Sequence, residues 1–261
     1  MSHSSIRHTL SQAKTCLALL ISLEGALAAS PPVDYGAFVL ERPWLGSDDP
    51  LVLDFLAAVR LELGQLQEAE GLLNEALLFQ LEQRIHGGAM TRLCERLALL
   101  HHRQGNPSTA ILFAKLATHT LVMQKREMHT REKAMADHLM RSYSGLRDQL
   151  SALLVATGRA GELANLDRAW VAGPGHGALP LEFSSAEQAV LDELRHLHAA
   201  FKDFSQQILA IRKADPAPSL EDASQQLMII ADARRDSRER FDTLMRTLEH
   251  RLEPTLRSTE G

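Results

Sequence analysis

The stretch TRLCERLALLHHRQGNPSTAILFAKLATHTLVMQ, residues Thr91 to Gln124, predicts the architecture of the whole chain. Read at a helical period, its first half carries an apolar stripe of Leu93, Leu97 and Leu100 that ends at Gly105. After Gly105-Asn106-Pro107, a second stripe consists of Ala110, Phe113, Ala114, Ala117 and Leu121. The alanines let two helix backbones approach closely, and glycine suits the turn between them. The stretch therefore predicts a helical hairpin of the kind that stacks into an array.

The composition supports an all-α fold and excludes some partners. Hydrophobic residues make up 45% of the 261 residues and aromatic residues only 5%, a mix that favours helices over sheets. The net charge of −5 argues against nucleic-acid binding, because no basic excess exists to neutralise phosphates. No stretch has the 18 consecutive apolar residues that indicate an integral membrane segment. Cys16 and Cys94 cannot form a disulfide framework, and the apolar neighbours of Cys94 predict a buried, inert thiol.

Residues 49–170 are predicted to form irregular tetratricopeptide-like helical hairpins. Segments that start at Leu61, His102 and Val155 align on the three glycines Gly64, Gly105 and Gly158. Glycine at the turn, followed by small residues on the second helix, is typical of this repeat. The first two segments fit this pattern, whereas the third has Leu163 and Trp170 in place of the two alanines. The glycines are 41 and 53 residues apart, which is longer than the usual repeat, so we expect extended helices. One of them is predicted to run unbroken from Arg126 to Thr157.

The last third, residues 184–253, predicts an antiparallel coiled-coil hairpin. Ser184 and Glu187 offer a capping box at its start, and apolar residues then alternate in steps of four and three. A proline-containing turn follows at Lys213–Pro218, and a second helix from Ser219 continues the same pattern. Arg234 and Ser237 interrupt the apolar stripe, either to fix the register or to face a partner.

The remaining segments have less distinct signals. Residues 1–30 are either an amphipathic helix or a secretory signal-like segment, so the chain is expected to be cytoplasmic or, on the second reading, exported. The proline-containing segment 31–48 is predicted to be a linker, the glycine-rich segment 171–183 a hinge loop, and residues 254–261 a tail.

The sequence shows no recognisable catalytic pattern. No two of the 12 histidines stand four residues apart with a carboxylate beside them, as in a helical zinc site, and no G-x-S-x-G motif occurs. We therefore expect no metal, no cofactor and no enzymatic activity. A helical metal-dependent hydrolase that uses the histidines is the alternative.

Three segments resemble a known family: ALLHHRQGNPSTAILFAKLATHTL (Ala98–Leu121), RDQLSALLVATGRAGE (Arg147–Glu162) and SSAEQAVLDEL (Ser184–Leu194). In this order they are similar to the tetratricopeptide region of bacterial proteins that carry a caspase-like CHAT protease domain. The resemblance covers roughly residues 50 to 253 and implies helical repeats and a helical hairpin that regulate a protease. No part of this chain matches the protease domain, so no catalytic residue carries over.

These observations lead to the hypothesis of a non-enzymatic interaction scaffold. Its repeats would hold a peptide or protein client, and its hairpin would dock a caspase-like protein or another copy of the chain. The repeat register places the candidate partner-binding residues on the inner helices: Arg92, Glu95, His102, Arg103 and Asp148. A self-associating structural coiled coil is the alternative.

Overall fold

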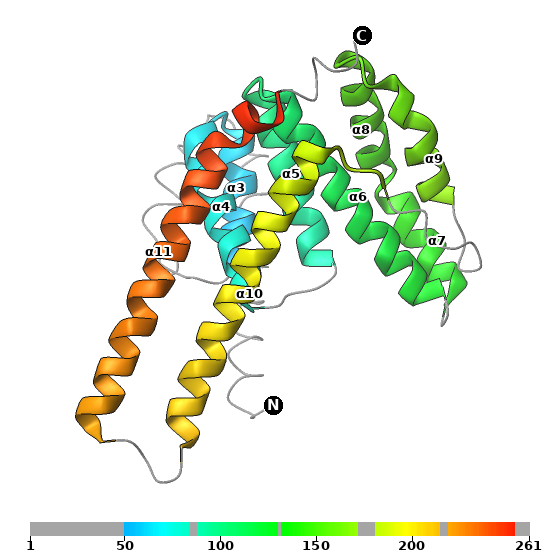
Figure 1. Ribbon diagram of the computed structural model, residues 1–261. Helices are drawn as coiled ribbons and strands as arrows, with labels where there is room; N and C mark the ends of the chain where they lie inside the picture. The colour runs from blue at the N-terminus through cyan, green and yellow to red at the C-terminus, as the bar shows by residue number, and fades with distance from the viewer. Residues whose placement is uncertain (1–49, 84–87, 130–131, 172–180, 215–218, 254–261) are drawn as a thin grey trace, which may run out of the picture.

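The computed structural model (Figure 1) describes residues 50–83, 88–129, 132–171, 181–214 and 219–253. Within these ranges every regular element is a helix, so the predicted all-α class is confirmed. The predicted N-terminal segment 1–30, the linker 31–48, the tail 254–261 and most of the hinge 171–183 lie outside the described residues.

The first four helices form two hairpins. Helix α3 (Pro50–Glu62) pairs with α4 (Leu66–Gln83), and α5 (Gly88–Arg103) pairs with α6 (Pro107–His129). The two hairpins also contact each other through α4 and α5. The hairpin predicted from Thr91–Gln124 is therefore present as α5 and α6.

The three aligned glycines mark turns of one geometry. Gly64, Gly105 and Gly158 have φ angles of 71°, 79° and 74°, a left-handed conformation that favours glycine. The residue after each glycine donates its N–H to the carbonyl five residues earlier. These bonds are Gln65 to Arg60 (2.9 Å), Asn106 to His101 (2.8 Å) and Arg159 to Leu154 (2.7 Å). Each preceding helix thus ends in a Schellman motif.

The predicted helix from Arg126 to Thr157 is wrong. Helix α6 continues to His129, and two shorter helices follow, α7 (Lys133–Ser142) and α8 (Ser144–Ala156). The break at Tyr143 has a physical reason. Met140 of α7 and Leu146 of α8 are both buried, yet a continuous helix would turn residues six apart to different faces. Breaking the helix between them lets both side chains reach the core.

A short helix and a long helical hairpin complete the fold. A short 3₁₀ turn (Ala160–Glu162) leads into α9 (Leu163–Val171). Helices α10 (Ser185–Lys213) and α11 (Leu220–Leu252) then run antiparallel (Figure 1). The predicted capping box at Ser184 and Glu187 is present. One half of this hairpin packs on α4 and α6, while the other half projects beyond the remaining helices (Figure 1).

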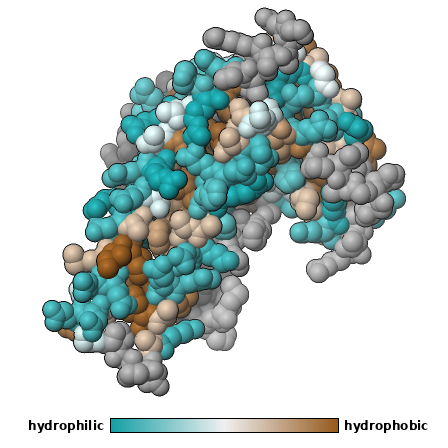
Figure 2. Space-filling model, viewed as in Figure 1, coloured by the Kyte–Doolittle hydropathy of each residue, from teal (hydrophilic) through white to brown (hydrophobic). Residues whose placement is uncertain are grey.

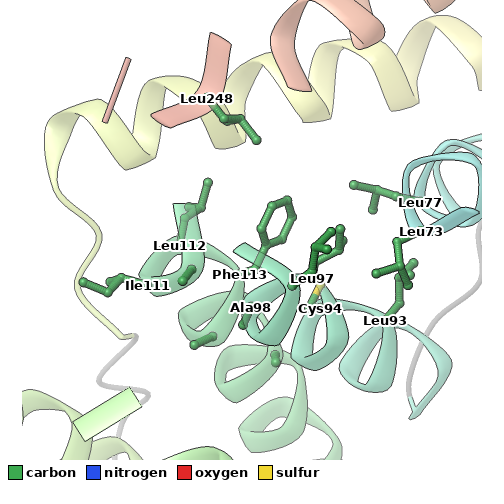
Figure 3. Packing of buried hydrophobic residues seen from close by; sticks show 14 of the residues in the cluster. Leu73, Leu77, Leu93, Cys94, Leu97, Ala98, Ile111, Leu112, Phe113 and Leu248 are labelled. Carbon is green, nitrogen blue, oxygen red and sulfur yellow. The ribbon is translucent and has the colours of Figure 1, made fainter. Parts of the chain in front are cut away.

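One hydrophobic core joins helices α3–α9 to the α10–α11 hairpin. Phe113 is completely buried, and Figure 3 shows it beside Leu97 and Cys94 of α5, with Leu248 of α11 above α6. Helix α11 also caps α6, because the Glu249 carboxylate accepts hydrogen bonds from the Ser108 and Thr109 N–H groups at 3.1 and 2.7 Å. The hairpin is thus an integral part of the fold.

The polar interruption of the α11 stripe contacts another part of the same chain. Arg234 pairs with Glu82 of α4 at 2.7 Å, and Arg238 pairs with Glu75 of the same helix. Ser237 is buried and donates its hydroxyl to the Ala233 carbonyl. Two ion pairs therefore join α11 to α4.

Candidate binding site

The residues predicted to contact a partner lie on two helices. Arg92, Glu95, His102 and Arg103 belong to α5, and Asp148 belongs to α8. All are exposed except Glu95, which is half-buried. Arg103 donates to the Leu61 carbonyl at 2.6 Å, so part of its side chain fixes the end of α3.

The structure brings Arg92 and Glu95 into a charged cluster with Asp54, Arg96 and Tyr143. Arg96 pairs with Asp54 at 2.7 Å. Burial raises the pKa of Asp54, with Arg96 and Arg92 opposing, and burial also raises the pKa of Glu95. These charges influence the Tyr143 hydroxyl, whose pKa is raised mainly by burial. The cluster therefore combines residues of α3, α5 and the α7–α8 junction, whereas His102 and Asp148 are not part of it.

A cavity lies against the opposite side of α5. Its lining includes Met90 and Cys94, which are about half a helical turn away from Arg92 around the helix. We call this cavity the central pocket; its volume is about 570 Å³. It is lined by Leu77, Gln80, Leu81, Met90, Cys94, Phe113, Leu116, His119, Thr120, Leu181, Glu182, Phe183, Gln188, Leu191, Leu194, Arg195 and His198.

The central pocket has an apolar floor and a polar mouth. Phe113, Cys94 and Leu77, labelled in Figure 3, are at most 3% exposed. By contrast, the Arg195 side chain is 66% exposed, and Glu182 is also exposed. The pocket therefore runs from the core to the surface between α4, α5, α6 and α10.

Three polar side chains define what the pocket can bind. Gln80 is only 4% exposed, and its Oε1 atom accepts no hydrogen bond within the described residues, which is costly for a buried amide. His198 Nδ1 lies 2.6 Å from the Leu81 carbonyl oxygen, so Nδ1 must donate, and in the neutral ring Nε2 is an acceptor. Burial, together with the charges of Arg126 and Arg195, lowers the pKa of His119. The pocket thus offers a buried, unpartnered hydrogen-bond acceptor, Gln80 Oε1, on apolar walls.

A buried ion cluster holds one wall of the pocket in place. Lys115 of α6 lies 2.8 Å from Glu187 of α10 and donates to the Glu182 carbonyl at 2.9 Å. Arg159 pairs with the same Glu187 at 2.9 Å and with Glu162 at 2.6 Å. Two cations and two anions balance, as buried charges must. The cluster fixes the start of α10 and the segment Leu181–Phe183 that borders the pocket.

The pocket's chemistry fits binding. Burial raises the pKa of Cys94 to about 12, so the thiol is protonated and unreactive, as its apolar neighbours predict. The described part of the chain contains no cluster of three histidine, cysteine or acidic residues placed to hold a metal. Likewise, none of its helices is both long and apolar enough to cross a membrane.

Sequence reasoning missed this pocket. Leu77, Cys94 and Phe113 fall on apolar stripes, which predict a core but not whether the core is completely filled. Gln80 was the available signal, because it is a polar residue next to Leu81 on a stripe that packs inward.

Comparisons with known proteins give no relative for this chain. No family model, no curated protein and no solved structure matches it. Its function must therefore be argued from its own residues.

Proposed function

We propose that the chain is a non-catalytic, all-helical interaction module that binds a protein client, and that the central pocket receives the client's apolar side chains. One observation carries this proposal. A cavity of about 570 Å³ leads from an apolar floor to a mouth lined by exposed charged residues. Protein–protein contacts concentrate their affinity in such desolvated pockets, while a polar rim excludes water.

The chemistry of the pocket favours an aromatic anchor with a hydrogen-bond donor. A Tyr or Trp side chain would fill the apolar floor and donate its O–H or N–H to Gln80 Oε1. Helices line most of the pocket, and an amphipathic client helix suits a helical groove. The charges of Glu182 and Arg195 would then lie beside the polar side of that helix.

The opposite side of α5 is the second contact surface in this proposal. Arg92 and Glu95 lie there in the charged cluster, and Arg103 follows 11 residues later on the same side of α5. His102 and Asp148 are further candidate contacts outside the cluster. A caspase-like protein is the first partner to test, because of the resemblance to the tetratricopeptide region of CHAT-domain proteins. Reversing the charges at Arg92 and Arg103 should weaken partner binding if this surface takes part.

A pair of matched substitutions tests the role of the pocket. Thr120→Phe adds a ring inside the pocket, whereas Thr243→Phe makes the same change on an exposed position of α11. Both threonines donate their hydroxyl to the carbonyl four residues earlier, so both variants lose this hydrogen bond. The tagged wild-type chain and the Thr243→Phe variant should retain one dominant client from the native host, and Thr120→Phe should lose it.

Thermal unfolding must first show that both variants fold. Equal recovery of the client with all three chains would contradict a role for the pocket. Recovery of the wild-type chain without any bound protein would contradict the claim that it binds a protein client. A small molecule bound to the chain at one-to-one stoichiometry in native mass spectra would contradict the protein client and identify that molecule as the ligand.

A further inference from the structure

The projecting half of the α10–α11 hairpin exposes an unusual amount of apolar surface. We call residues 207–214 and 219–230 the hairpin tip. Figure 2 shows hydrophobic side chains gathered at this end of the molecule. Five of the ten large apolar side chains that are exposed in the described parts of the chain belong to it. They are Leu209 (49% exposed), Leu220 (88%), Leu227 (43%), Met228 (66%) and Ile229 (63%).

Two helices cannot cover these side chains. Leu227, Met228, Ile229 and Ile230 are consecutive, so they point in four directions that are about 100° apart. Only Ile230 is buried, at 5% exposure. Apolar residues therefore occupy sides of α11 that α10 does not contact, a pattern that indicates further helices.

A groove between the two helices offers a seat for such a helix. It has a volume of about 430 Å³, and its lining includes Ala210 and Ile211 of α10 and Ile229 and Ile230 of α11. The small side chain of Ala210 allows the backbone of another helix to approach α10 closely.

The hairpin tip carries one basic and one acidic pair of residues, so the tips of two copies can be complementary in charge. Helix α10 ends with Arg212 and Lys213, whereas α11 begins with Glu221 and Asp222. A two-fold axis parallel to the hairpin would place α10 of one copy beside α11 of the other. The basic end of each α10 would then face the acidic start of the partner's α11.

We propose that two copies of this chain associate through their hairpin tips to form a four-helix bundle. The exposed apolar residues form the bundle core, and the two basic and acidic pairs fix its orientation. This surface is separate from the central pocket, so the dimer and the client can be tested independently.

Analytical ultracentrifugation of the full chain tests the dimer. The wild-type chain should sediment as a dimer. The double substitution Met228→Asp/Ile229→Asp should raise the dissociation constant by about 100-fold or more, since each lost burial contributes about tenfold. Met135→Asp/Val155→Asp is the matched control, because both side chains are exposed outside the hairpin tip, and this variant should remain a dimer.

Charge reversal tests the orientation. Arg212→Glu/Lys213→Glu makes the tip acidic, and Glu221→Lys/Asp222→Lys makes it basic. Each variant alone should be monomeric, and their mixture should form a one-to-one heterodimer. Variants that merely lose helix-end stabilisation would not recover on mixing. A monomeric wild-type chain, an oligomer that tolerates Met228→Asp/Ile229→Asp, or a mixture that stays monomeric would overturn the proposal.

Discussion

The Nζ atom of Lys115 lies 2.8 Å from the Oε2 atom of Glu187, and both side chains are 1% exposed. This pair joins α6 to the first turn of α10. Glu187 also completes the capping box by accepting the Ser184 N–H at 2.8 Å. One carboxylate therefore fixes both the start of α10 and its position against the repeats.

Removing the cation of this pair should destabilise the protein strongly. Lys115→Met leaves Glu187 with one cation fewer in a buried site, and such losses cost about 3–5 kcal/mol. Lys133→Met, on an exposed position of α7, should change the free energy of unfolding by less than about 0.5 kcal/mol. Urea denaturation measures both, and equal losses in the two variants would contradict a structural role for the ion pair.

The same cluster should make the free energy of unfolding depend on pH in the acidic range. Burial opposes ionisation of Glu162, but hydrogen bonds from Arg159 and Lys115 outweigh it and hold its pKa below the ordinary value of 4.5. The stabilisation is therefore complete above pH 4.5 and is lost as the pH falls through the lower folded-state pKa. Glu162→Gln should reduce the decline of unfolding free energy below pH 4.5. An unchanged pH profile would argue against the cluster.

A second titration should occur at higher pH. Burial lowers the pKa of His101 below its ordinary value of 6.5, although the charges of Glu70 and Glu249 oppose this effect. The unfolded chain then binds the proton more tightly, so stability falls as the pH drops through 6.5. His101 stacks on Phe113 with ring centroids 5.7 Å apart, and an interaction with the Gln104 side chain also opposes the lowering of its pKa.

His101→Phe should keep the stacking on Phe113 and lose only the interaction with Gln104. We expect it to stabilise the protein more at pH 5 than at pH 8. Chemical denaturation at the two pH values measures the difference. A gain of equal size at both would mean that His101 does not titrate on unfolding.

Replacing glycine by alanine should have opposite effects on stability at a turn and inside a helix. Gly105 has a φ angle of 79° with open space around it, so Gly105→Ala should cost about 1 kcal/mol for conformation alone. Gly71 lies inside α4, also with open space, and Gly71→Ala should stabilise by about 0.5–1 kcal/mol. In thermal unfolding, the midpoint temperature should fall for Gly105→Ala and rise for Gly71→Ala. The same sign at both positions would contradict the left-handed turn.

Local features of the fold were predictable from the sequence because their causes are local. Gly105, the capping box at Ser184 and Glu187, and the helical spacing of the apolar residues each act within one or two turns. The break at Tyr143 was missed because the residues around it are compatible with a continuous helix. Only the buried positions of Met140 and Leu146 require the break, and these depend on packing against α6.

The candidate site was harder to predict because it depends on distant pairs. Lys115 and Glu187 are 72 residues apart, and no period in the sequence connects them. An apolar stripe looks the same whether a neighbour fills the space beside it or leaves a cavity. The side chains of Leu77 and Cys94 thus predict burial but not the central pocket.

Site-specific photo-crosslinking tests the central claim, that the pocket binds a protein client. A benzophenone amino acid replaces Gln188 at the mouth of the pocket or, as a control, Glu239 on an exposed position of α11. Irradiation in the native host should crosslink the benzophenone at position 188 to one protein, at an amphipathic segment that carries a Tyr or Trp. The additional substitution Thr120→Phe should abolish this product. No product at Gln188, or the same products at Gln188 and Glu239, would contradict the claim.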